Sequence, residues 1–149
     1  MDLFAALHPL PFVHPMLVHF PPVLLVVAAT LDLLALATRR QSLAVTARWM
    51  LWAGTLAAGL AVWSGHESAE ALENQMSPDT RALVMLHHDW AIGVLVGAAI
   101  LAVSRLFFGE RRFRRASVVL AVALAVTIAI VSHLGGQLVF LHGVAVRPS

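Results

Sequence analysis

The stretch SVVLAVALAVTIAIVSHL, residues 117–134, decides the fold class of this chain. Its 18 residues contain no arginine and no acidic residue, and as an α-helix they would extend about 27 Å, close to the thickness of a bilayer core. Apolar and polar residues do not alternate along it, so the stretch does not suit a strand of a membrane β-barrel. Because the backbone must satisfy its own hydrogen bonds in lipid, we predict a transmembrane helix here.

Three similar apolar stretches precede this one, at residues 20–37, 45–63 and 90–108. Each is long enough to cross a bilayer with modest tilt. The loops between them are short, which favours an up-down arrangement of neighbouring helices. We therefore predict an all-α membrane protein, a bundle of four transmembrane helices that forms a single integral membrane domain over residues 1–149. The transmembrane helices are expected at about residues 17–38, 44–66, 84–108 and 116–141.

The composition agrees with this class and excludes several functions. Of the residues, 60% are hydrophobic and 12% are charged, whereas soluble domains carry about 25% charged residues. The absence of cysteine excludes disulfides, thiolate metal sites, iron–sulfur clusters and covalently attached haem. The net charge is only +2 and the arginines lie in short loops between apolar stretches, so we expect no nucleic-acid partner.

The arginines mark one side of the predicted membrane. Eight of the ten lie in or beside the loops that follow the first and third apolar stretches, whereas most acidic residues lie in the other connections. The positive-inside rule places arginine-rich loops in the cytoplasm. We therefore predict a multi-pass protein of the bacterial inner membrane with both termini outside, on the periplasmic side.

Histidines gather at the other depth of the predicted bundle. Several lie about 17–22 residues from the arginines of their own stretch, which corresponds to about 25–33 Å along a helix. His66 and His88 are each eleven residues from Ser77, so an antiparallel hairpin with its tip at Ser77 places them side by side. The candidate cofactor-binding residues in this layer are His14, His19, His66, His87, His88, His133 and His142.

Imidazoles at one depth suit two kinds of site. Two neutral imidazoles that face each other across a bundle hold b-type haem, and the layer contains enough histidines for one or two haems. Three or four imidazoles around a smaller ion suit Zn or Cu instead. The candidate ligands for such an ion are His19, His66, His87 and His133.

Our leading interpretation is a membrane electron-transfer subunit that binds b-type haem and exchanges electrons with a redox partner protein. The alternatives are a histidine-rich Zn or Cu protein and a non-catalytic subunit of a larger membrane complex. The chain contains no nucleophile elbow, phosphate-binding loop or H-E-x-x-H motif, so hydrolytic catalysis has no support.

Asp32 and Arg105 are charged residues inside apolar stretches. Both lie several residues from the arginine-rich side, so they are expected to meet across two helices. Burial of a charge in a membrane is costly unless it is paired, and we therefore predict a buried ion pair that fixes the helix register. The alternative is a proton route to a quinone.

Two motifs resemble those of a known family. The segment HPMLVHFP, residues 14–21, resembles the opening signature of a bacterial four-helix membrane family called domain of unknown function 2231, and LGGQLVFLHGV, residues 134–144, resembles its closing signature. Gln137 and Phe140 depart from the acidic residue and tyrosine common there. Some members are joined to Rieske-type or c-type cytochrome domains, which implies redox work. The positions that match the family are His14, His19, Asp32, Gly135, Gly136, His142 and Gly143.

Overall fold

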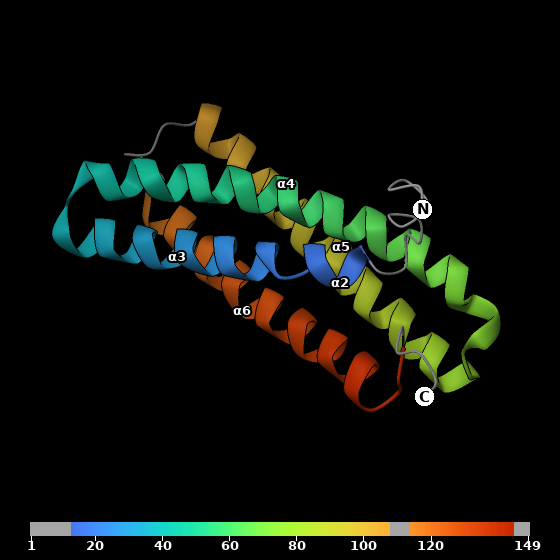
Figure 1. The fold of residues 1–149 in the computed structure, drawn as a ribbon. Coiled ribbons are helices and arrows are strands. Elements are labelled where there is room, and N and C mark those ends of the chain that lie inside the picture. Colours follow the sequence, from blue (N-terminus) through green and yellow to red (C-terminus); the bar gives the residue numbers. More distant parts are fainter. Residues whose placement is uncertain (1–12, 108–113, 145–149) are drawn as a thin grey trace, which may run out of the picture.

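The computed structural model describes residues 13–107 and 114–144, and the regular structure in this part of the chain is helical throughout. Figure 1 shows the helices arranged as an elongated bundle. A single 3₁₀ turn, η2, follows α4 at Glu73–Gln75. The α-helices are α2 (His14–Leu17), α3 (Phe20–Thr38), α4 (Gln41–Leu72), α5 (Pro78–Phe107) and α6 (Arg114–Phe140).

Four helical segments are long and apolar enough to cross a membrane, which confirms the predicted fold class. The first of them combines α2 and α3 over His14–Thr38. The long helices pack in the cyclic order α3, α4, α5, α6 and back to α3, so α3 and α5 occupy opposite corners of the bundle. This order is that of an up-down bundle, in which each helix packs against its neighbours in the chain.

The connection between α4 and α5 is a helical hairpin. Both helices continue beyond the expected transmembrane bounds at residues 66 and 84, and the hairpin projects past α6 (Figure 1). Ser77 caps α5, because its Oγ accepts a hydrogen bond of 3.2 Å from the Thr80 N–H, and Pro78 occupies the first helical position. α5 therefore begins at this capping signal, whereas α4 ends at Leu72, before the 3₁₀ turn.

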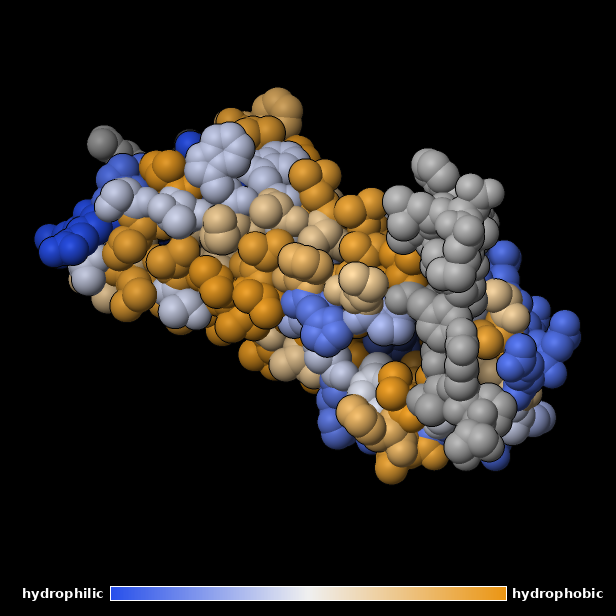
Figure 2. All heavy atoms as spheres, viewed as in Figure 1, coloured by the Kyte–Doolittle hydropathy of each residue, from blue (hydrophilic) through white to orange (hydrophobic). Residues whose placement is uncertain are grey.

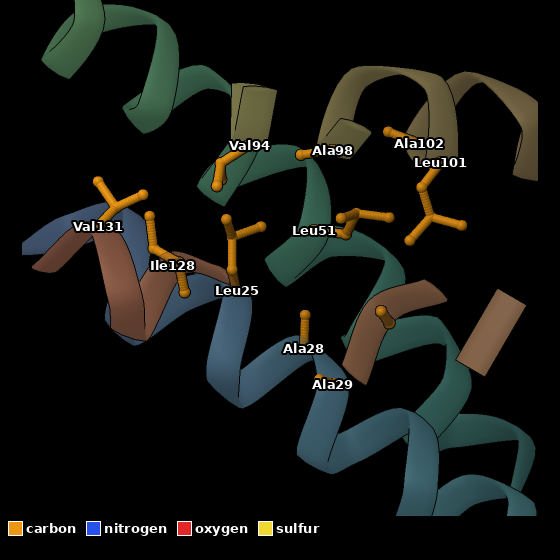
Figure 3. Close-up of a cluster of buried hydrophobic side chains, with 11 residues drawn as sticks. Leu25, Ala28, Ala29, Leu51, Val94, Ala98, Leu101, Ala102, Ile128 and Val131 are labelled. Carbon is orange, nitrogen blue, oxygen red and sulfur yellow. The ribbon is translucent and has the colours of Figure 1, made fainter. Parts of the chain in front are cut away.

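The core of the bundle is built largely from small side chains. Leu25, Leu51, Val94 and Val131 come from the four long helices and meet near its centre, among several alanines (Figure 3). A Cβ placed on Gly54 would lie 2.8 Å from Cδ2 of Leu25, so glycine permits the close approach of α3 and α4. Small residues at helix contacts are characteristic of bundles in lipid, where close van der Waals packing drives association.

The outer surface of the helices is apolar. Figure 2 shows hydrophobic residues over most of the middle of the molecule, whereas hydrophilic residues gather toward its two ends. Large side chains such as Leu56, Ile100 and Val119 are more than 60% exposed. Such a surface is stable in contact with lipid, and the chain is a membrane protein. We call the end with Arg39, at the α3–α4 turn, the arginine end, and the end with the α4–α5 hairpin the histidine end.

Candidate functional site

His14 lies on α2 and is held against α4. Its Nδ1 is 3.1 Å from Oγ of Ser64, and that hydroxyl donates its own hydrogen to the Ala61 carbonyl oxygen at 3.1 Å. When the hydroxyl hydrogen is used there, the Ser64 oxygen can accept a hydrogen bond from Nδ1–H of His14. A Cβ placed on Gly65 would lie 2.8 Å from Cε1 of this imidazole, so the ring rests on the glycine backbone.

His87 lies on α5 and is held against α6 in the same manner. Its Nδ1 is 3.1 Å from the Val131 carbonyl oxygen. A carbonyl only accepts hydrogen bonds, so Nδ1 carries the proton and Nε2 of the neutral ring is an unprotonated nitrogen. A Cβ placed on Gly135 would lie 3.2 Å from Cε1 of His87, so this ring too rests on a glycine.

The two imidazoles both belong to the histidine end of the bundle. Both side chains are half-buried, His14 on α2 and His87 on α5. α2 continues the line of α3, which is diagonally opposite α5, so the pair spans the bundle (Figure 1). Within the described residues, Nε2 of His87 makes no hydrogen bond, and the Ser64 contact of His14 is made by Nδ1. Nε2 of each ring is therefore the candidate ligand atom.

His66 and His88 lie side by side at the base of the hairpin, as their equal spacing from Ser77 predicts. Their ring centroids are 5.7 Å apart with an angle of 31° between the ring planes. Nε2 of His66 is also 3.4 Å from Oε1 of Glu70, one turn along α4, and both side chains are mostly exposed. This pair adjoins the buried one through the neighbouring positions of His87 and His88 on α5.

Three of the predicted ligands do not project into this cluster. His19 is an exposed residue at the start of α3, and His133 is exposed on α6, where its Nε2 contacts Nε2 of Gln137 at 3.1 Å. His142 follows the end of α6, and its Nδ1 lies 3.4 Å from Oγ1 of Thr80 on α5. These three side chains therefore lie apart from His14 and His87. Equal depth along the helices does not imply that the side chains face the same way.

The arrangement limits which cofactor the site can hold. Among the described residues, no three histidine or acidic side chains converge as ligands of one metal ion. The predicted Zn or Cu set of His19, His66, His87 and His133 is therefore not assembled, since two of its members face outward. The half-buried pair of imidazoles would supply the two protein ligands that a b-type haem requires.

A second polar cluster lies toward the arginine end. Nη2 of Arg105 is 2.6 Å from Oδ2 of Asp32, and both residues are buried, so the structure contains the pair expected from the sequence. Nε of Arg105 donates to Oγ of Ser117 at 2.7 Å. The cluster thus connects α3, α5 and α6. Like the histidine pair, it joins two sides of the bundle that lie diagonally opposite each other, those of α3 and α5.

Several residues that hold these groups received no role from the sequence. Ser64 and Ser117 stand as single polar residues near the ends of apolar stretches, and that position is a signal that points to a hydrogen-bonding role. The Val131 carbonyl carries no such signal, because every residue has one. Gly135 was marked only through the family motif.

Comparison with known proteins gives one result about the family. The model of a family described as "Predicted membrane protein (DUF2231)" matches residues 8–148, which is nearly the whole chain. No curated protein and no solved structure matches significantly.

Proposed function

The chain belongs to the DUF2231 family of predicted membrane proteins, and from this premise we propose that it is an electron-transfer subunit that binds one b-type haem between His14 and His87. In this proposal Nε2 of each imidazole would bind the haem iron. Bound haem supplies one-electron redox chemistry. The chain supplies the two ligands and the apolar helices around them.

The observation that carries the proposal is the matched anchoring of the two half-buried imidazoles. Each ring is fixed through Nδ1, by Ser64 in one case and by the Val131 carbonyl in the other. A histidine that binds a metal through one nitrogen characteristically donates the other N–H to such a partner, which fixes the tautomer and the ring orientation. Gly65 and Gly135 have no side chain and so leave the space in which the two imidazole rings lie.

We also propose that the arginine end faces the cytoplasm of a bacterial inner membrane and that both termini are periplasmic. The arginines at the α3–α4 turn and the start of α6 support this orientation through the positive-inside rule. The haem would then lie near the outer face, beside the α4–α5 hairpin. Electrons would pass to or from a redox partner protein, a larger membrane complex or a quinone.

The test of this function is the absorption spectrum of the purified protein. The full-length chain is expressed with haem available, solubilised in detergent, and measured before and after reduction with dithionite. A sharp Soret band, with split visible bands on reduction and about one haem per chain, is the expected result. A colourless protein with stoichiometric Zn or Cu would contradict haem binding and favour a metal-binding function. If the protein contained neither haem nor metal, the role of a non-catalytic subunit of a larger complex would be favoured.

The two adjacent glycines of α6 provide a matched pair of variants. Gly135→Val is expected to lower haem affinity by roughly 10-fold or more, because its side chain would push His87 away from the Val131 carbonyl. Gly136→Val is expected to have little effect, since a Cβ there meets nothing within 4 Å. The measurement is haem per mole of purified protein. Equal haem content in the two variants would contradict the placement of His87.

A further inference from the structure

The outward face of α6 carries a regular stripe of residues. Its members alternate in spacing between four and three positions, which is the pattern of a helix seam that packs against one other helix. All but Gln137 are exposed, with Phe140 at 87% and Val119 at 66%. This seam, as we name it, consists of Val119, Ala123, Val126, Ile130, His133, Gln137 and Phe140.

Two polar side chains interrupt the apolar seam. The Gln137 amide donates to Nε2 of His133 at 3.1 Å, which assigns the ring proton of the neutral imidazole to Nδ1. Within the described residues, Nδ1–H of His133 and Oε1 of Gln137 make no hydrogen bond. Ile130 on one side and Phe140 on the other are exposed apolar residues, so the two polar groups lie between apolar positions of the seam.

Exposed threonines in the same band behave differently. The hydroxyls of Thr30 and Thr127 each donate to the carbonyl four residues earlier, at 2.8 and 2.9 Å. The hydrogen-bond donors of these side chains are therefore satisfied within their own helix and need no partner from another helix. His133 and Gln137 retain a free donor and a free acceptor, which a partner helix can satisfy.

We propose that the seam packs against α6 of a second copy of this chain in a two-fold symmetric dimer. Two copies inserted with the same topology present their α6 helices in parallel, so each seam residue meets its own counterpart. His133 and Gln137 then face the same two residues at the same depth. A primary amide both donates and accepts, so the Gln137 side chains pair with each other across the axis.

The shape of the seam agrees with this partner. Ala123 is small, and Gly136 beside the seam has no neighbour within 4 Å of an added Cβ, so a second helix can approach closely. A seam repeat of 3.5 residues corresponds to left-handed packing with a crossing angle of about +20°. A polar residue at one position of such a seam specifies the register of the paired helices and the number of helices that associate. The dimer does not depend on haem, because it uses none of the groups that hold His14 or His87.

Disulfide cross-linking tests this dimer directly, because the natural chain has no cysteine. Val126→Cys and Ile130→Cys place one thiol each on the seam, and Ile100→Cys, at a position 65% exposed on α5, is the control. The purified full-length variants are reconstituted in liposomes and oxidised. The two seam variants are expected to give a product at twice the 16.0 kDa mass of the chain, and the control is expected to remain monomeric. Absence of this product, or equal cross-linking of the control, would overturn the proposal.

A second set of variants tests the polar pair. In the Val126→Cys background, replacement of both His133 and Gln137 by leucine is expected to weaken dimerisation by about 3- to 30-fold, the range for lost hydrogen bonds between membrane helices. Thr127→Val is the control, because that hydroxyl bonds within its own helix. Helix content by circular dichroism verifies folding of each variant. Unchanged dimerisation of the leucine variant would show that the polar pair does not join two copies.

Discussion

Replacement of His87 by alanine is expected to abolish stoichiometric haem binding, whereas replacement of His133 by alanine is expected to leave it intact. His87 is half-buried, and its Nδ1–H is fixed by the Val131 carbonyl, so Nε2 is the proposed axial ligand. Loss of an outer-shell partner alone costs about 10- to 100-fold in metal affinity, and loss of the ligand itself should cost at least that. The measurements are the Soret absorbance and the haem content per chain.

His14→Ala should behave like His87→Ala, and the two variants together test the assignment of the ligand pair. Ser64→Ala is the milder companion, because it removes the acceptor of Nδ1 and keeps the imidazole. We expect it to retain haem with lowered affinity. If His133→Ala lost haem while His87→Ala kept it, the ligand assignment would be wrong even though the protein bound haem.

Replacement of Asp32 by alanine is expected to lower the free energy of unfolding by about 3–5 kcal/mol, the cost of leaving one member of a buried ion pair without its partner. The Arg105 guanidinium would then lose the carboxylate that lies 2.6 Å away and would keep only its contacts with Ser117. The large effect follows from burial, because exposed ion pairs contribute at most about 1 kcal/mol. Unfolding in detergent, followed by circular dichroism, measures the change.

The double variant Asp32→Ala with Arg105→Leu separates charge burial from side-chain loss. It is expected to be more stable than Asp32→Ala alone, because it does not leave the buried Arg105 guanidinium without its carboxylate. Thr30→Ala on the same helix is the control, and a change within about 0.5 kcal/mol is expected at this exposed position. Equal destabilisation by the single and double variants would show that the ion pair does not stabilise the bundle.

Much of the fold was predictable because its determinants are local. The length of each apolar stretch predicted the number of spans, and Ser77 was the expected tip of the hairpin between α4 and α5. The hairpin pairing of His66 with His88 also followed from counting residues, since antiparallel helices keep equal distances from a common tip. The pairing of Asp32 with Arg105 followed from the cost of an unpaired charge at this depth.

The depth of the candidate-site histidines along the bundle was predictable, but the direction in which each side chain points was not. Counting residues at 1.5 Å each placed the histidines correctly near one end of the bundle. Each residue also rotates about 100° around the helix axis, so neighbouring positions at nearly the same depth face different surroundings. Val131 faces the core and His133 faces outward on α6, although they are only two residues apart.

The sequence by itself determined the membrane class, the four spans and the depth of each polar residue, because apolar length and helical rise are properties of single segments. Only the tertiary structure decided that His14 and His87 share the interior and that His133 lies on an outer seam. That choice depends on how four helices rotate to bury Leu25, Leu51, Val94 and Val131 together, and this packing is a property of the whole bundle.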